Sequence, residues 1–364
     1  MRVRSLSIAF ALVSALGLTL GGCSNGDGSG TDDAGSQATG DQTPGTTEGP
    51  ASSDDSADEQ DPSESLGPFH IGITQIVDHP SLNLIREGFK DALVQAGVEA
   101  TYDEQNAQND QSNAATIAGS FAADASIDLI VAIATPTAQA VVQQIADRPV
   151  LFAGVTDPVD AGLVPSFEPS GTNVTGTSDL NPNANPVGLI QEIVPDVKTV
   201  GVLYSSAEAN SEVQVEAYRA EAEPLGIEIE AQAITNTSEV ATGAQALEGV
   251  DAILIPTDNT VVAALEAVIQ FAEQAKIPLF SADAESVDRG TVATRGISYY
   301  DVGLRTGEMA VQILRDGVDV GSIPTLVVED TELKVNPAAA DRMGISVPEA
   351  ILADAIVVEE AAAE

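Results

Sequence analysis

The chain contains the same order of apolar and polar segments twice. Residues 128–153 have an apolar run, a polar turn, a segment with helical apolar spacing and a second apolar run. Residues 251–281 repeat that order. Such an order is typical of a βαβ unit, in which a helix connects two buried strands. The sequence therefore predicts two such units, each with parallel strands.

A second pair of segments is repeated ahead of these units. The apolar run at residues 70–75 corresponds to the run at 199–204, and Gly97, which ends the next helical segment, corresponds to Gly226. Two α/β halves in the same order predict two lobes. Ligands of parallel sheets bind beyond the carboxyl ends of the strands, where the polar turns lie. We therefore expect one cleft between the lobes.

The composition allows two cores and argues against one class of partner. The chain has 364 residues, of which 43% are hydrophobic, so each lobe can bury a core of its own. The formal net charge is -42. Because no basic stripe is available to neutralise phosphates, nucleic acid is not expected as a partner. The acidic surface is expected to keep the protein soluble and monomeric.

The first 22 residues have the features of a secretory signal peptide. Arg2 and Arg4 precede an apolar run that is too short to span a membrane. The ending Leu-Gly-Gly-Cys resembles the bacterial lipobox, whose cysteine is acylated. This predicts a lipid on Cys23, the single cysteine, and an anchor on the extracytoplasmic face of the cell membrane. The alternative is an unmodified secretory cut beside an incidental cysteine.

Residues 23–68 are expected to form a tether. They are rich in Gly, Ser, Thr, Asp and Pro, and they contain acidic residues but no basic or aromatic ones. Such a segment cannot bury enough apolar area to offset its ordering entropy, so it is predicted to be disordered. A tether of this kind suits a domain that is held away from a membrane.

The remaining residues predict the two lobes and their connections. Lobe 1 is expected to comprise residues 69–178 and 284–323, and lobe 2 residues 179–283 and 324–364. This division places crossings between the lobes after Ser178, near Ser281 and at residues 325–328. Each lobe is predicted to be a mostly parallel sheet flanked by helices.

Short motifs at the predicted strand ends together resemble one known family. They are Gln75 with residues 79–81, residues 133–139, 156–158 and 178–182, residues 204–206 with 210–211, and Pro256 with residues 258–260. Over residues 69–352 the chain is similar to substrate-binding lipoproteins of ABC importers with the type I periplasmic-binding-protein fold. The branch is the one linked to tryptophan and related aromatic amino acids. The resemblance implies a cleft between two lobes joined by three strands, and delivery of the ligand to an ABC permease.

The carboxylate of an amino-acid ligand would need hydrogen-bond donors. Free backbone N–H groups at a helix N-terminus supply them, and the helix dipole favours an anion there. Thr135, Thr137 and Ala138 open a predicted helix and are the expected site. An ordinary helix cap with proline in the first turn has the same pattern, and the resemblance favours ligand binding.

The ammonium group of such a ligand would need a carboxylate. Asp157, Asp179 and Asp258 all lie at predicted strand ends. Each could instead be a turn or cap residue, which is the commoner role of aspartate in loops. We expect one or two of the three to contact ligand.

An aromatic ligand side chain would need an aromatic or apolar wall. Tyr204, Phe152 and Tyr300 are the candidates by position. Tyr204 ends a predicted strand and is preferred, whereas Phe152 and Phe280 lie within apolar runs and are expected in the core. His79 is expected to be a turn residue. The other expected ligand contacts are polar: Gln75, Thr156, Asn210, Asn259 and Ser281.

No catalytic, cofactor or metal site is indicated by the sequence. Residues 69–364 have no Gly-x-Ser-x-Gly elbow, no glycine-rich phosphate loop after a strand and no His/Cys cluster with metal spacing. We therefore expect a protein that is not an enzyme and that uses neither cofactor nor metal.

These observations predict an extracytoplasmic solute receptor that closes by hinge motion around a small, aromatic amino acid and presents it to a permease. Two alternatives stay open at this point. One is a receptor of the same fold for another solute, such as a sugar or a nucleoside. The other is a ligand sensor for a signalling membrane protein.

Overall fold

The computed structural model describes residues 67–181 and 183–359. The predicted signal peptide, the lipidation of Cys23 and the expected tether as far as residue 66 lie outside these described residues. No helix in the described ranges is long and apolar enough to cross a membrane.

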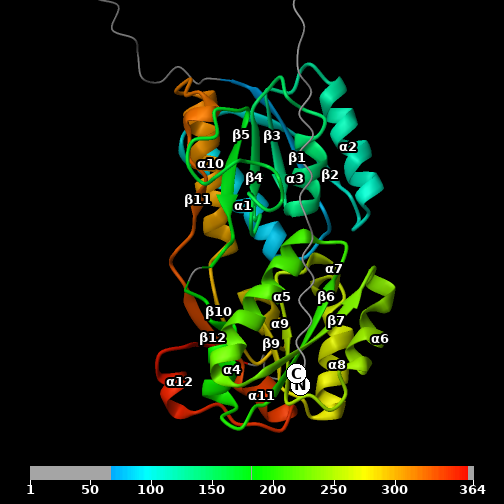
Figure 1. The fold of residues 1–364 in the computed structure, drawn as a ribbon. Helices are drawn as coiled ribbons and strands as arrows, with labels where there is room; N and C mark the ends of the chain where they lie inside the picture. The colour runs from blue at the N-terminus through cyan, green and yellow to red at the C-terminus, as the bar shows by residue number, and fades with distance from the viewer. Residues whose placement is uncertain (1–66, 182, 360–364) are drawn as a thin grey trace, which may run out of the picture. The chain divides into compact units, whose positions relative to one another are not determined.

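Lobe 1 contains a parallel sheet with helices on both faces (Figure 1). Among the described residues its strands pair in the order β11 (Leu326–Val327), β5 (Val174–Ser178), β4 (Val150–Ala153), β3 (Leu129–Ile133), β1 (Phe69–Gln75) and β2 (Ala100–Asn106). Its helices are α1 (Pro80–Gln95), α2 (Gln111–Ala123), α3 (Thr135–Val142) and α10 (Tyr299–Leu314). Alternate residues of β3 pack on opposite faces, Val131 with α1 and α10 and Ile130 with α2 and α3. Burial on both faces explains why this strand is a continuous apolar run in the sequence.

Lobe 2 contains a second parallel sheet and a smaller sheet beside it. The parallel sheet has the order β7 (Glu228–Ile234), β6 (Thr199–Ser205), β8 (Ala252–Ile255) and β9 (Leu279–Ser281). In the smaller sheet β10 (Ala293–Gly296) is antiparallel to β12 (Glu332–Val335), which is parallel to β13 (Ile356–Val357). Leu254 of β8 and Val335 of β12 belong to one hydrophobic core, so the two sheets form a single lobe.

The helices of lobe 2 alternate with its strands. They are α4 (Pro186–Ile193), α5 (Ala209–Ala222), α6 (Val240–Ala246), α7 (Asn259–Val262), α8 (Leu265–Ala275), α9 (Ala284–Arg289), α11 (Pro337–Arg342) and α12 (Glu349–Ala353). Short 3-10 helices occur in both lobes: η1 (Glu223–Leu225), η2 (Thr237–Glu239) and η3 (Val320–Ser322). The α/β class, with parallel sheets flanked by helices in two lobes, is confirmed.

The sequence duplication corresponds to a structural one. The first strand of each repeat, β1 or β6, pairs in parallel with the two strands that follow it in its repeat. Gly97 and Gly226 occupy the same left-handed conformation, with φ of 70° and 69°, which glycine adopts without steric cost. Asp128 accepts a hydrogen bond from the backbone N–H of His70, and Asp251 accepts one from that of Thr199.

Helices α1 and α10 lie against each other because glycines remove side chains from their contact. A Cβ atom on Gly303 would lie 2.1 Å from the carbonyl oxygen of Ile85, and one on Gly88 would lie 2.2 Å from that of Tyr300. Both distances are far below van der Waals contact, so only glycine fits. This close approach brings the N-terminal residues of both helices to the same side of lobe 1, facing lobe 2.

Among the described residues the chain crosses between the lobes after β5, after β10 and after β11. Two of these crossings differ in position from the sequence prediction. Residues 284–296 were expected in lobe 1, but α9 packs against β9 and β10, and β10 pairs with β12 in lobe 2. Residues 324–328 were expected in lobe 2, but β11 pairs with β5 of lobe 1. Short strands contain no local signal for the sheet that they join, since their partners are distant in sequence.

Candidate functional site

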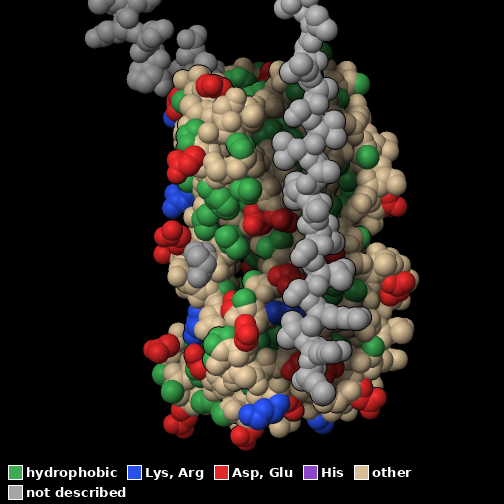
Figure 2. Space-filling view, in the orientation of Figure 1, with side chains coloured by type: hydrophobic (Ala, Val, Ile, Leu, Met, Phe, Trp, Pro, Cys, Tyr) green, Lys and Arg blue, Asp and Glu red, His purple; other side chains and the backbone are tan. Residues whose placement is uncertain are grey.

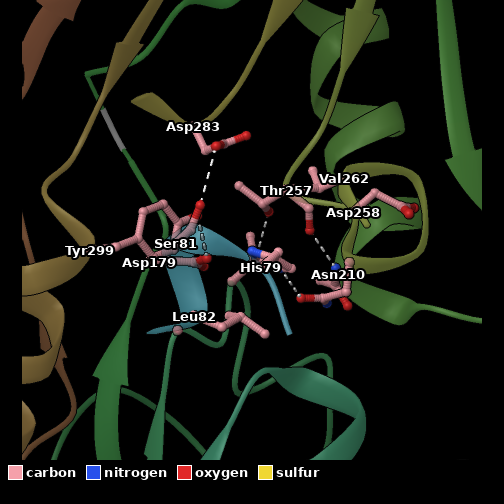
Figure 3. A pocket seen from close by; sticks show the side chains of 13 residues that line it. His79, Ser81, Leu82, Asp179, Asn210, Thr257, Asp258, Val262, Asp283 and Tyr299 are labelled. Atoms are coloured by element: carbon pink, nitrogen blue, oxygen red, sulfur yellow. Dashed lines mark hydrogen bonds between the residues drawn. The ribbon is translucent and has the colours of Figure 1, made fainter. Parts of the chain in front are cut away.

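The lobes enclose a small polar cavity (Figure 3). About 330 Å³ of space lies between its lining residues, part of it open to solvent, and the volume free for water is about 20 Å³, room for about one water molecule. From lobe 1 and the crossings it is lined by His79, Ser81, Leu82, Gly154, Thr156, Asp179 and Tyr299. From lobe 2 it is lined by Asn210, Thr257, Asp258, Asn259, Val262 and Asp283. We call this space the inner cavity.

A second cavity adjoins the first, with Thr156, Asp179, Thr257 and Tyr299 in both linings. About 620 Å³ of space lies between its lining residues, part of it open to solvent, and the volume free for water is about 90 Å³. Its other walls come mainly from α4, α5 and the crossings, and they are largely apolar: Leu180, Ala184, Pro186, Ala217, Tyr218, Ala282 and Ile297. Its remaining polar lining residues are Asn181, Gln214, Glu221, Thr294 and Arg295. We call this space the side cavity.

Hydrogen bonds across the inner cavity hold the lobes together. Ser81 donates to Asp283 at 3.2 Å, and the hydroxyls of Thr156 and Thr257 lie 3.3 Å apart. A further contact lies at the first residue of α2, where Gln111 donates to the backbone carbonyl of Ala207 at 2.7 Å. These contacts show that the lobes are closed on each other.

The N-terminus of α1 faces the inner cavity without a capping side chain. His79 is the N-cap residue but makes no side-chain hydrogen bond to the helix, and Pro80 has no N–H group. Ser81 and Leu82, in the first turn, both line the cavity. His79 is 8% exposed; its ring Nε2 lies 3.3 Å from Asn259 Oδ1, whereas its Nδ1 has no partner. A helix end with these features attracts an anion.

Asp179 lies where the two cavities meet. Its Oδ2 accepts a hydrogen bond from the hydroxyl of Tyr299 at 3.1 Å, while its Oδ1 is enclosed and has no partner. Asp179 is 7% exposed, and burial raises the pKa of its carboxyl against the opposing effects of the Thr156 and Tyr299 hydroxyls. An enclosed carboxylate oxygen without a donor suits a cationic ligand group, because pairing removes the cost of its burial.

Asp258 and Glu208 have a different role, which is to cap α7. Asp258 accepts from the backbone N–H groups of Ser205 and Val261, at 2.6 and 2.8 Å, and burial raises its pKa to about 7. Glu208 accepts from the N–H and hydroxyl of Thr260 at 2.9 and 2.7 Å. Both oxygens of Asp258 are therefore already bonded, which leaves it less available than Asp179 to a ligand.

The inner cavity is acidic. Asp179, Asp258 and Asp283 line it, and its lining includes no Lys or Arg among the described residues. Beside it, burial and the charge of Asp283 raise the pKa of Glu285 to about 7. Burial lowers the pKa of His79 despite the attraction of Asp283. No group of His, Cys, Asp and Glu in the described ranges has the arrangement of a metal site.

Five of the sequence-predicted residues line the inner cavity: Thr156, Asp179, Asn210, Asp258 and Asn259. The others line neither cavity: Gln75, Thr135, Thr137, Ala138, Asp157, Tyr204 and Ser281. The hydroxyl of Thr137 donates to the backbone carbonyl of Ile133 at 2.6 Å, and Gln75 donates to that of Val77 at 2.7 Å. Asp157 accepts from the backbone of its own turn, as an ordinary turn aspartate does.

The aromatic lining differs from the expectation. Tyr204 packs against the core of lobe 2 and lines neither cavity. Tyr218 on α5 belongs to that core and Tyr299 at the start of α10 to the core of lobe 1, and both also line the side cavity. Tyr218 shares a helix face with Gln214 and Glu221, at i, i+4 and i+7 spacing. That spacing was present in the sequence. However, a helix face that lines a cavity has the same residue spacing as a helix face that packs on the core, so the spacing alone did not predict the cavity.

Comparisons with known proteins agree with this architecture. The family described as ABC transporter substrate binding protein matches residues 70–359. The chain is 39% identical over 272 residues to the tyrosine-binding protein of Clostridioides difficile (strain R20291), covering 73% of this chain and 78% of that protein.

Two solved structures are also similar. One is the ABC domain from Streptococcus pneumonia in complex with L-Trp, at 38% identity and a TM-score of 0.77, covering 80% of this chain and 100% of that one. The other is a ligand-free, open structure of a substrate binding protein with adhesive properties from Clostridium difficile. It has 39% identity and a TM-score of 0.61, and covers 80% of this chain and 99% of that one.

Proposed function

The chain belongs to the family of ABC transporter substrate-binding proteins, and from this premise we propose that it captures an aromatic amino acid between its lobes for delivery to an ABC permease. The family is one of solute-binding proteins and not a class of enzymes. The names of two similar proteins support the ligand class, since one binds tyrosine and the other was solved with L-Trp.

The observation that carries the proposal is the position of Asp179 between an acidic cavity with a helix N-terminus and a larger apolar one. The ligand ammonium pairs with Asp179 Oδ1. The ligand carboxylate lies at the first turn of α1, near Ser81 and Leu82, where the helix dipole replaces the missing Lys or Arg. Ser81 and His79 are the side chains nearest to this position.

The ligand side chain occupies the side cavity. Apolar residues form most of its walls, and the rings of Tyr218 and Tyr299 supply aromatic surface. Burial of an aromatic ring against such walls is a large favourable term in binding. Of the sequence-predicted residues, we keep Thr156, Asp179, Asn210, Asp258 and Asn259 as site residues, and we assign structural roles to the others.

We infer that the closed arrangement described here is the one that holds ligand. At nearly equal identity the chain has the higher TM-score with the L-Trp complex and the lower one with the ligand-free, open structure. A receptor can report occupancy only if its ligand binds the closed form more tightly than the open form. The interlobe bonds of Ser81 and Gln111 belong to the closed form.

The location of the protein follows from the same proposal. A substrate-binding protein acts on the extracytoplasmic side of the membrane, and a lipid on Cys23 would anchor it there with residues 24–68 as a tether. The acidic surface favours a monomer, and Figure 2 shows acidic side chains spread over the visible face.

Calorimetric titration of the purified full chain with each of the twenty amino acids tests the ligand class. We expect heat of binding with aromatic amino acids and little with small or acidic ones. Sugars and nucleosides serve as comparison ligands. Binding of one of these, with no response to any aromatic amino acid, would overturn the proposal.

A further inference from the structure

We propose that Glu221 accepts a hydrogen bond from the far end of the ligand ring and so selects aromatic amino acids that carry a polar hydrogen there. This inference rests on the proposed function. Tyrosine has a phenol O–H and tryptophan an indole N–H at the ring, whereas phenylalanine has neither. Glu221 would accept a hydrogen bond from the first two and find no partner in the third.

The placement of Glu221 follows from one face of α5. Asn210 lines the inner cavity, and Gln214, Tyr218 and Glu221 continue along the same helix face into the side cavity. Gln214 marks the junction, because its Oε1 accepts from the backbone N–H of Thr257, a residue that lines both cavities. Glu221 is two helical turns further, about 10 Å along the axis. A ligand held by its ammonium at the junction therefore directs its ring along α5 toward Glu221.

The carboxylate of Glu221 is available as an acceptor. Its Oε2 is enclosed by protein but has no hydrogen-bond partner. Burial raises its pKa, and the backbone N–H of Val187 opposes that shift. Arg295 lines the same cavity but pairs with Glu192 at 3.8 Å. Among the described residues, the side cavity thus has two carboxylate oxygens without a donor, Asp179 Oδ1 at its junction with the inner cavity and Glu221 Oε2 further along α5.

An unpaired acceptor favours ligands that have a polar ring hydrogen and disfavours ligands that lack one. A ligand O–H or N–H gains a hydrogen bond to a charged group, and a ligand without one leaves the carboxylate buried and unpaired. The apolar walls cannot make this distinction, since phenylalanine fills them as well as tyrosine does. Glu221 therefore sets specificity, while Asp179 and the start of α1 hold the parts common to all amino acids.

Calorimetric titration of the full chain with L-tyrosine, L-tryptophan and L-phenylalanine tests this inference. For the unmodified chain we expect phenylalanine to bind at least about tenfold more weakly than the better of the other two. In Glu221→Leu the affinity for whichever of L-tyrosine and L-tryptophan binds the unmodified chain more tightly should fall about tenfold or more. The affinity for L-phenylalanine should stay the same or rise. Glu221→Gln, which keeps an acceptor oxygen, should lie between.

Glu212→Gln is the matched control, because Glu212 is an exposed carboxylate on the same helix. It should leave all three affinities unchanged. An equal loss for all three ligands in a folded Glu221→Leu protein would show a structural role and overturn the inference, as would no loss for any of them. Failure of the unmodified chain to bind any aromatic amino acid would instead contradict the proposed function itself.

Discussion

Tyr299 donates its hydroxyl hydrogen to Oδ2 of Asp179, across a distance of 3.1 Å, from the first residue of α10 to the segment that leaves β5. The bond fixes the carboxylate so that the other oxygen, Oδ1, lies enclosed and unpaired at the junction of the two cavities. Both residues owe their positions to elements of lobe 1. The close packing of α1 and α10 therefore fixes the position of Tyr299, the residue that orients the Asp179 carboxylate.

Asp179→Asn should weaken amino-acid binding without weakening the fold. Loss of a charged partner costs about 1.5–3 kcal/mol, or roughly 10- to 100-fold in affinity. The free energy of unfolding of the ligand-free protein should stay the same or rise, because a buried charge is removed. Titration calorimetry and thermal unfolding measure the two effects. Asp157→Asn, at a turn residue that lines neither cavity, is the control, and an equal loss of affinity there would count against the assignment.

The ligand-free protein should lose stability as the pH rises from about 4 to about 7. Burial raises the pKa of Asp258 from 3.8 and that of Glu285 from 4.5, each to about 7. Between about pH 4 and pH 7 the folded state then binds more protons than the unfolded state. The contribution of Asp258 and Glu285 to the free energy of unfolding is therefore complete below about pH 4 and is lost as the pH rises through about 7.

Thermal unfolding of Glu285→Gln between pH 4 and 8 separates this effect from general charge repulsion. The variant should show a smaller fall in unfolding temperature with pH than the unmodified protein. Glu168→Gln removes one exposed charge and serves as the control. If both variants flatten the curve equally, repulsion over the whole surface and not burial of Glu285 is the cause.

Gln111→Ala should favour the open form. Gln111 donates to the carbonyl of Ala207 across the lobes, and the bond is lost when they separate. We expect roughly two- to fivefold weaker ligand binding, mainly through faster dissociation. Stopped-flow kinetics and small-angle scattering of the ligand-free protein measure this. Gln105→Ala, which removes a bond to Asp103 within lobe 1, should change neither quantity.

Gly303→Ala should destabilise lobe 1 by about 1–3 kcal/mol, because its Cβ would overlap the backbone of Ile85. Gly119→Ala on α2 is the contrasting change. Its Cβ would meet the flexible end of Gln144 at 3.1 Å, so the helix propensity of alanine should make it neutral or stabilising. Denaturant unfolding compares the two variants, and an equal loss in both would refute the packing explanation.

Cys23→Ser should release the protein from the membrane fraction of the cell and leave its ligand affinity unchanged. A lipid on this residue supplies the proposed anchor, and the binding site lies in the described lobes. Detergent partitioning of cell fractions is the measurement, with Ser29→Ala as the control. Retention of the serine variant in the membrane fraction would show that another feature anchors the chain.

The sequence by itself determined the architecture. The two apolar runs of each βαβ unit, the helical spacing between them and the paired Gly97 and Gly226 are local signals. Backbone geometry turns such signals into strands, helices and left-handed turns with few alternatives. Because the carboxyl ends of parallel strands share one edge of a sheet, the sequence also located Asp179 and Asp258 near the cleft.

Only the tertiary structure decided which polar ends reach the cavities. The N-terminus of α1 and not that of α3 lines the inner cavity, and Tyr299 and Tyr218 take the place expected for Tyr204. Strand partners were also undecided, since β10 joins lobe 2 and β11 joins lobe 1. The physical reason is that these outcomes depend on how two lobes pack and rotate against each other. Contacts between residues tens of positions apart, or more than a hundred apart, leave no periodic trace in either segment.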